Sequence, residues 1–167
     1  MNTLQDLFLQ ETQELLGAER QIATLLPQMA EMATSPDVKA VFQEHETQTQ
    51  GQIQRLESLF GQLGQAPQEI PSPALQALAS EAQQKLDQIQ DPALREAFLI
   101  AAQQKVEHFE IACYGTARSH ALQLDMADAA DLLQQTLEEE KSTDERLSRL
   151  AENKVNDQAD PQHAQGS

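Results

Sequence analysis

The chain of 167 residues has few or none of several residue types, and each shortage excludes a class of protein. Its one cysteine, Cys113, leaves no disulfide to be formed within the chain, so a reducing cytoplasm is the expected compartment. Tryptophan is absent, and Tyr114 is the one tyrosine. The six glycines are scattered, which excludes a glycine-rich phosphate loop. No Ser/His/Asp or Cys/His arrangement indicates a catalytic nucleophile.

Basic residues and long apolar runs are also scarce. Lysine and arginine total 11 against 27 acids, which gives a formal net charge of −16. Such a charge repels nucleic acid and anionic membranes, so neither is an expected partner. No run approaches the ~18 consecutive apolar residues that a membrane span requires. The N-terminal residues lack the basic and apolar regions of a secretory signal.

What is abundant is glutamine, alanine, leucine and glutamate, all good helix formers, so the composition predicts one all-α domain. Helix starts are marked where a capping residue precedes a proline or an apolar stretch. These capping residues are Ser35, Ser72, Asp91 and Asp125. The predicted helices span 3–33, 36–63, 73–89, 92–123 and 126–154, and Pro27 is expected to kink the first of them.

The order of these helices predicts the architecture. Two long helices follow each other closely, a long crossover with a short helix comes next, and two more long helices complete the chain. This arrangement is typical of a four-helix bundle with one crossover connection. We assign residues 1–156 to the bundle and expect the polar, aperiodic tail 157–167 to be disordered.

Helical periodicity gives each long helix an apolar stripe, which on the third includes Val106, Phe109 and Cys113. The same stripes contain polar residues. Those expected to point inward are Glu11, Glu19, His45, Thr49, Gln52, Glu110 and Glu140, with Glu107 at the boundary of its stripe, Asp144 beside Glu140, and His108 facing outward. A buried carboxylate is costly unless it is paired, protonated or bound to a metal.

Counting residues from the turns at ~1.5 Å per residue places the inward acids at one level of the bundle. Carboxylates on all sides of a bundle core are how di-iron and di-manganese sites are built, so a dinuclear Fe or Mn site is one interpretation. Its candidate ligands are Glu19, His45, Gln52, Glu107, Glu110, Glu140 and Asp144. The other interpretation is a buried polar network, or acids paired with Arg, Lys or His, with His45 as a hydrogen-bonded core residue. Tyr114 lies near the inner boundary of its helix, within reach of a carboxylate.

Two runs, QKVEHFEIACYGT (104–116) and LEEEKSTDERL (137–147), resemble the YciF-like family of bacterial stress proteins. AERQI (18–22) and HETQTQGQ (45–52) are similar to its first two helices, and the resemblance covers residues 3–156. It implies a ferritin-like, rubrerythrin-like bundle that forms a homodimer, acts in stress responses and holds a dinuclear metal site. The chain departs from the pattern at Gln48, where the family commonly has glutamate.

Two functional hypotheses follow. In the first, the chain is a ferritin-like stress protein whose core binds iron or manganese and either oxidises ferrous iron or consumes peroxide. In the second, it is a metal-free oligomeric bundle that serves as a structural or interaction module under stress. The second is motivated by Gln48 and by the lack of a Glu-x-x-His motif on the second and fourth long helices.

Overall fold

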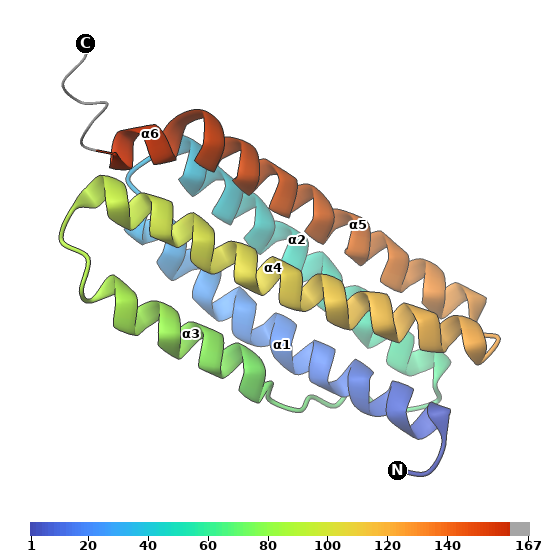
Figure 1. Cartoon of the computed structure of the whole chain (residues 1–167). Coiled ribbons are helices and arrows are strands. Elements are labelled where there is room, and N and C mark those ends of the chain that lie inside the picture. Colours follow the sequence, from blue (N-terminus) through green and yellow to red (C-terminus); the bar gives the residue numbers. More distant parts are fainter. Residues whose placement is uncertain (161–167) are drawn as a thin grey trace.

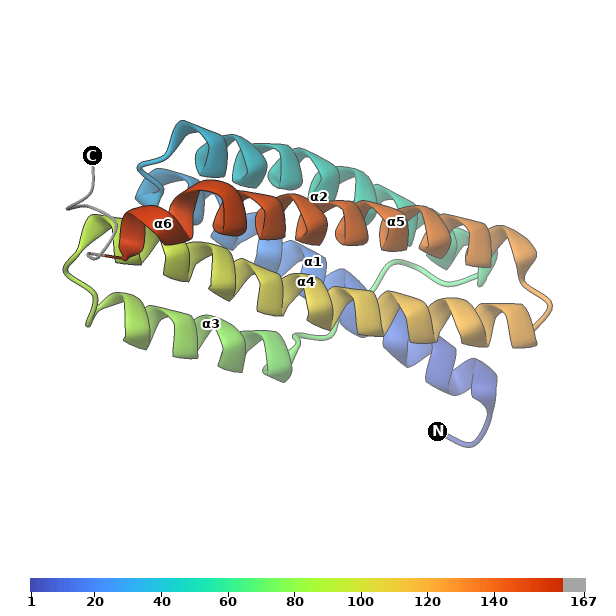
Figure 2. The same ribbon diagram turned by 45° about the horizontal axis from the view of Figure 1, so that its top comes forward.

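The computed structural model describes residues 1–160, and every regular element within them is helical. The four long helices are α1 (Leu4–Met32), α2 (Pro36–Gln62), α4 (Pro92–Gln123) and α5 (Ala127–Leu150). They pack as an antiparallel bundle in which α1 lies beside α2 and α4 beside α5 (Figure 1). The short helix α3 (Pro73–Leu86) belongs to the crossover and lies outside the bundle, beside α4 (Figure 2). The predicted all-α bundle with an extra crossover helix is confirmed.

Two of the predicted helix starts are capped as expected. The Ser72 hydroxyl accepts a hydrogen bond from the backbone N–H of Leu75, and the Asp91 carboxylate accepts one from the N–H of Leu94 at 2.8 Å. In both helices a proline follows the cap at the first helical position, where its missing N–H costs nothing. The helix α1 continues through Pro27 to Met32, and the expected kink stays a prediction.

Ser35 precedes α2 but does not cap it with its side chain, so that prediction is wrong. The turn between α1 and α2 is instead held by Glu96, which reaches across from α4 and is 4% exposed. Its carboxylate accepts hydrogen bonds from the backbone N–H and the hydroxyl of Thr34, both at 2.8 Å, and from the N–H of Ser35 at 3.2 Å. A charged acceptor from another helix satisfies these donors in place of a local cap.

Replacing Glu96 with glutamine is expected to lower the free energy of unfolding by roughly 1–3 kcal/mol, because a buried amide NH₂ then faces backbone donors. Urea denaturation followed by circular dichroism measures the change. The matched control is Glu145→Gln on α5, where the side chain is 68% exposed and little change is expected. Equal midpoints for the two variants would contradict the role given to Glu96.

The turn from α4 to α5 also differs from the prediction. Asp125 was expected to cap α5, but it ends α4 with a left-handed backbone conformation, φ 58°, and Met126 occupies the N-cap position. The Met126 N–H donates to the Ala121 carbonyl at 2.9 Å and the Asp125 N–H donates to the Leu122 carbonyl at 3.2 Å. This is the bonding pattern of a Schellman motif, which satisfies the last carbonyls of α4. Aspartate is among the few side chains that tolerate the left-handed region.

The crossover segment before α3 is seated directly on the backbone of α1. The Ile70 N–H donates to the Gln13 carbonyl at 3.0 Å, and the chain then passes over Gly17. A Cβ atom at position 17 would lie 2.0 Å from the Ile70 carbonyl oxygen and 2.7 Å from its carbon. Only glycine allows this close approach.

We therefore expect Gly17→Ala to cost roughly 1–3 kcal/mol of stability, because the crossover must move away from α1. The control is Gly115→Ala in α4, where an added Cβ meets no atom within 4 Å of the described residues. That substitution should stabilise the helix by about 0.5–1 kcal/mol. Chemical denaturation of both variants checks the opposite signs, and a Gly17→Ala protein as stable as the control would refute the contact.

The C-terminal end of the bundle extends beyond the predicted boundary. A π-helical turn (Ala151–Val155) and the short α6 (Asn156–Ala159) follow α5, and Val155 is buried in the core. The predicted disordered tail 157–167 therefore begins too early, because residues 157–159 are helical. The rest of that prediction, 161–167, lies outside the described residues. Among the helices of the described chain, none is long and apolar enough to cross a membrane.

Candidate metal centre

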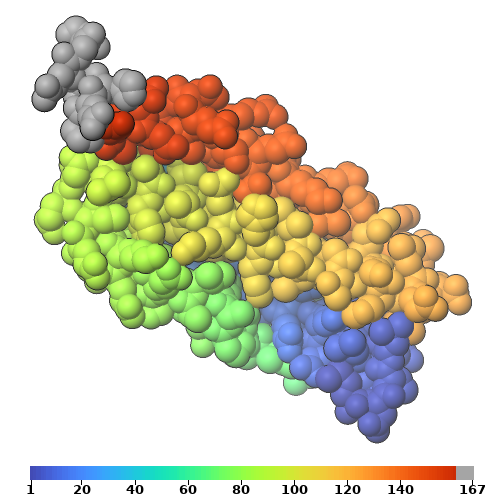
Figure 3. Space-filling view, viewed as in Figure 1, coloured from blue at the N-terminus to red at the C-terminus, as the bar shows by residue number. Residues whose placement is uncertain are grey.

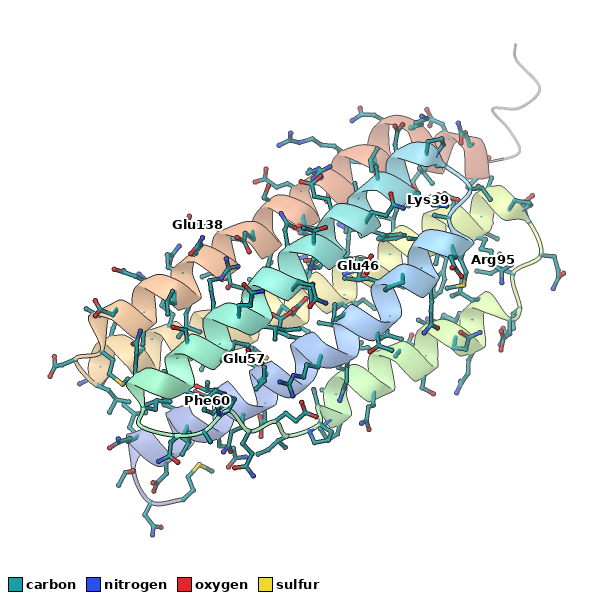
Figure 4. The ribbon with its side chains drawn as sticks, turned by 180° about the vertical axis from the view of Figure 1, so that it is seen from behind. Lys39, Glu46, Glu57, Phe60, Arg95 and Glu138 are labelled. Atoms are coloured by element: carbon teal, nitrogen blue, oxygen red, sulfur yellow. The ribbon has the colours of Figure 1, made fainter. Side chains whose placement is uncertain are left out.

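A layer of polar side chains crosses the middle of the bundle and divides the hydrophobic core into two clusters. One cluster contains Leu26, Phe42, Leu99 and Leu147, and the other contains Phe8, Phe60, Ala117 and Leu133. Phe60 marks the second cluster in Figure 4. The buried residues of the layer are Glu19, His45, Thr49, Gln52, Gln103, Glu107, Glu110, Glu140 and Thr143, drawn from all four long helices. The predicted mid-bundle layer of inward polar residues is present.

Four residues of the layer converge closely. His45, Glu107, Glu110 and Glu140 each offer one ligand atom, and these atoms all lie within 4.8 Å of one another. We call these four residues the core quartet. Each is at most 1% exposed. One imidazole and three carboxylates on facing helices form a donor set suited to iron or manganese.

His45 lies between two carboxylates of the quartet. Its Nδ1 is 2.9 Å from Glu107 Oε1, and its Nε2 is 3.3 Å from Glu140 Oε2. Burial by itself lowers the pKa of His45, but the charges and hydrogen bonds of Glu107 and Glu140 outweigh burial and raise that pKa to about 10. In the metal-free chain the imidazole is therefore a cation held by the two acids.

Two glutamine amides orient the carboxylates of the quartet. The Gln103 amide donates to Glu107 Oε1 at 2.7 Å, and the Gln52 amide donates to Glu140 Oε1. The same Gln52 amide also donates to Glu139 at 3.2 Å, and Glu139 pairs with Arg55 near the surface. Each orienting amide occupies one oxygen of its carboxylate; the second oxygen of Glu107 has no hydrogen-bond partner among the described residues, and that of Glu140 faces His45 Nε2 at 3.3 Å.

Glu19 and Tyr114 form a second group beside the quartet. The Tyr114 hydroxyl donates to Glu19 Oε1, and both side chains are fully buried. Burial raises the pKa of Glu19 to about 7, against the lowering effect of the Tyr114 hydrogen bond and of His45. Burial also raises the pKa of Tyr114 well above its usual value, with the charge of Glu19 adding to the effect. The sequence-based expectation that Tyr114 hydrogen-bonds a carboxylate is confirmed.

Burial also raises the pKa of Glu140 and Glu110, two further acids of the layer. Burial raises the pKa of Glu140 to about 8, although His45 opposes the shift. The pKa of Glu110 is raised well above its usual value by burial first and then by repulsion from Glu140, Glu19 and Glu107. Raised pKa values favour protonation, which reduces the negative charge that Glu19, Glu110 and Glu140 place around His45.

The layer contains many buried polar atoms without a hydrogen-bond partner. Those in and beside the quartet are His45 Nε2, Glu107 Oε2, both carboxylate oxygens of Glu110, Glu140 Oε2, Glu19 Oε2, Gln52 Oε1 and Thr49 Oγ1. Buried polar groups are nearly always satisfied in native proteins, and a cluster of orphaned acceptors calls for a specific cause such as a bound ion. Because all but one of these atoms are oxygens, a cation is the group that fits them.

Most of the predicted ligands meet in this layer, but three predicted placements are wrong. Glu107 was placed at the boundary of its helix, but it is fully buried and belongs to the quartet. Asp144 lies outside the quartet with 19% of its side chain exposed, where it accepts from Gln104 at 3.1 Å and lies 3.5 Å from the exposed His108. Glu11 was expected to point inward but is half-buried, and its carboxylate pairs with His120 at 2.7 Å.

The error over Glu107 comes from the rotation of α4. Its buried row runs through Gln103, Glu107, Glu110 and Tyr114, whereas Val106, Phe109 and Cys113 are half-buried. Val106 lines the groove beneath α3, and Phe109 and Cys113 line a second groove between α1 and α4. The space-filling view shows α3 packed along this side of α4 (Figure 3). Hydrophobicity favours this apolar row as the core row, but the row faces grooves that α3 and α1 border. Gln103 was missed, and its spacing four residues before Glu107 was the signal available.

A family model described as a domain of unknown function, DUF892, matches residues 3–160. The chain belongs to the DUF892 family. The protein YciF of Escherichia coli K12 is 37% identical over 161 residues, which cover 96% of this chain and 97% of YciF. The crystal structure of the E. coli stress protein YciF is similar with a TM-score of 0.88, covering 93% of this chain and 99% of that one.

Two further solved structures resemble this DUF892 chain. One is YcfI from Rhodopseudomonas palustris, to which a structural role is provisionally assigned; it has 37% identity and a TM-score of 0.87 over 88% of this chain and 94% of its own. The other belongs to the ferritin-like di-iron-carboxylate proteins of Bacillus anthracis, with 19% identity and a TM-score of 0.70 over 90% of this chain and 99% of its own. At that identity the second likeness shows the fold alone, which is ferritin-like.

Proposed function

We propose that this DUF892 chain is a ferritin-like stress-response protein that binds iron or manganese in the middle of its bundle. The observation that carries the proposal is the set of orphaned donor atoms of the core quartet, which are fully buried and face one another. Without an ion, the three acids of the quartet would face one another with His45 as the one basic group among the described residues of the layer and two neutral amides as hydrogen-bond donors. The stress-response part of the proposal is supported by the similarity to the stress protein YciF.

The residues of the layer have distinct roles in this proposal. The core quartet holds the ion, and Gln52 and Gln103 orient two of its carboxylates. The apolar clusters above and below the layer keep bulk water out. Glu19 holds the Tyr114 hydroxyl proton beside the site. Bound iron or manganese supplies one-electron redox chemistry, which suits oxidation of ferrous iron or consumption of peroxide.

Anaerobic loading with Fe²⁺, followed by addition of O₂ or H₂O₂ in separate experiments, tests the proposed activity. We expect the loaded protein to oxidise ferrous iron or consume peroxide faster than the same iron free in buffer. The comparison variants are Glu110→Gln, which removes a ligand, and Glu138→Gln, which changes an exposed acid two residues from Glu140 on the outer side of α5 (Figure 4). Rates equal in all three proteins would contradict a role for the quartet in turnover.

A second candidate is a metal-free structural bundle. It is favoured by the amide hydrogen bonds that already satisfy one oxygen each of Glu107 and Glu140, and by the structural role assigned to YcfI. A protein whose thermal midpoint is the same with a chelator and with Mn²⁺ would support this candidate. The homodimer expected from the family resemblance stays a prediction that sedimentation velocity would check.

A further inference from the structure

The inward positions that carry ligands in di-iron bundles are only partly acidic in this chain. Such bundles take one glutamate from each of two helices and a Glu-x-x-His pair from each of the other two. Here α1 and α4 supply Glu19 and Glu110. The inward pair with Glu-x-x-His spacing on α2 is Thr49-x-x-Gln52, and on α5 it is Glu140-x-x-Thr143. Three of the four paired positions therefore hold a neutral side chain that is a weaker donor.

The missing donors are replaced from one turn away. His45 precedes Thr49 by four residues, and Glu107 precedes Glu110 by three, which corresponds to roughly 6 Å along α2 and roughly 4.5 Å along α4. The helices α2 and α4 begin at the same end of the bundle, because Glu96 near the start of α4 bonds the residues just before α2. His45 and Glu107 are therefore displaced in the same direction, and they meet at 2.9 Å.

The hydrogen bonds around the quartet leave one potential ligand atom available to a metal ion on each of three residues. Gln103 occupies Glu107 Oε1 and Gln52 occupies Glu140 Oε1, while Glu107 Oε2 has no hydrogen-bond partner among the described residues. His45 Nδ1 faces Glu107 at 2.9 Å, and Nε2 faces Glu140 Oε2 at 3.3 Å. Glu110 adds two oxygens without a donor. An imidazole whose second nitrogen is held by a carboxylate is the usual state of a metal-bound histidine.

Glu19 lies outside the quartet, whose four ligand atoms are all within 4.8 Å of one another. One of its oxygens accepts from the Tyr114 hydroxyl, and the other has no hydrogen-bond partner among the described residues. Apart from Glu19 and Glu110, the side chains at this level that could bind a second metal ion are those of Thr49 and Gln52, which are buried and neutral. Within the described chain His45 is the one histidine of the layer, since His108 is exposed and His120 pairs with Glu11.

From these contacts we infer that the first metal ion binds at His45, Glu107, Glu110 and Glu140, with His45 and Glu107 supplying ligands from one helical turn away, and that its binding does not require Glu19. This inference rests on the proposed function. It specifies where the first metal ion binds and that it binds before any second ion. Gln52 and Gln103 are positioning residues, because each holds a carboxylate so that one oxygen points to the ion. A second ion beside Glu19 binds more weakly, so the chain loads asymmetrically.

Titration of the chelator-treated full chain with Mn²⁺ alone tests this inference, with free Mn²⁺ measured from its electron paramagnetic resonance signal. The wild type is expected to take up one tightly held ion per chain before free Mn²⁺ appears. Glu19→Gln should keep that ion, with a dissociation constant that changes far less than in Glu107→Gln. Glu107→Gln should raise the dissociation constant of that ion by at least roughly 100-fold. Losing a residue that only hydrogen-bonds a metal ligand usually has a smaller effect. Circular dichroism confirms that each variant keeps its helices.

The outcomes separate this inference from the proposed function. A wild type that holds no ion tightly overturns both. Two ions bound with equal affinity, or loss of the tight ion in Glu19→Gln, would overturn the asymmetric order while leaving metal binding intact. Should Glu107→Gln fail to fold, the wild-type stoichiometry and the Glu19→Gln titration still decide the question.

Discussion

Glu110→Gln is expected to change stability in opposite directions with and without metal. In the metal-free chain the variant should be more stable than the wild type at pH 9 by roughly 1–3 kcal/mol, because it removes a buried acid that has no donor on either oxygen. With metal, the wild type should gain about 2.7 kcal/mol at a free metal concentration of 100 times its dissociation constant, and the variant should gain almost nothing. The stability order of the two proteins therefore reverses.

Differential scanning fluorimetry with a chelator and with Mn²⁺ measures this reversal. For a protein of this size the metal-dependent gain corresponds to an increase in the melting temperature of roughly 5–10 °C. The matched control is Glu138→Gln, which changes an exposed glutamate of α5 and should follow the wild type under both conditions. If Glu110→Gln gains as much stability from Mn²⁺ as the wild type does, Glu110 is not a ligand.

The metal-free chain is also expected to lose stability as the pH rises from 5 to 9. Glu19 and Glu140 have folded pKa values of about 7 and about 8, above the ordinary 4.5, so between pH 4.5 and those values the folded state holds protons that the unfolded state has released. Stability falls with pH wherever the folded state binds more protons. His45 acts in the same direction: its contribution is full below pH 6.5 and is lost as the pH rises toward about 10.

One pKa unit corresponds to about 1.4 kcal/mol, so the combined loss should be on the order of 3 kcal/mol or more. Urea denaturation at a series of pH values in a chelator measures it. Saturating Mn²⁺ should reverse the trend, because metal displaces the protons and binds more tightly as the pH rises. A metal-free unfolding free energy that is flat or increasing over this range would show that the acids of the layer are not protonated in the folded chain.

The helices and the level of the site were predictable because both depend on local features. A capping residue before a proline fixes where a helix starts, as at Ser72 and Asp91. Once the helices and turns are placed, counting residues puts Glu19, Gln52, Glu110 and Glu140 at one height. The Gln52 amide does donate to Glu140, as that count implies.

The rotation of α4 was not predictable from periodicity. Two rows of this helix have core-like features: the apolar row of Val106, Phe109 and Cys113, and the polar row that contains Glu107 and Glu110. Hydrophobicity favours the first row as the core. The crossover helix α3 decides otherwise, because its packing partly covers Val106 and leaves the centre to the acids. Long-range contacts such as Glu96 with Thr34 have no local pattern and were missed for the same reason.

Metal content of the native protein tests the central claim most directly. The full chain is purified without chelators, and iron and manganese per chain are measured by plasma mass spectrometry, before and after anaerobic reconstitution and desalting. The buried donors of the core quartet predict at least one ion of iron or manganese per chain, retained by Glu138→Gln and lost in Glu110→Gln. Substoichiometric metal in the reconstituted wild type, no higher than in Glu110→Gln, would contradict a metal centre in this bundle.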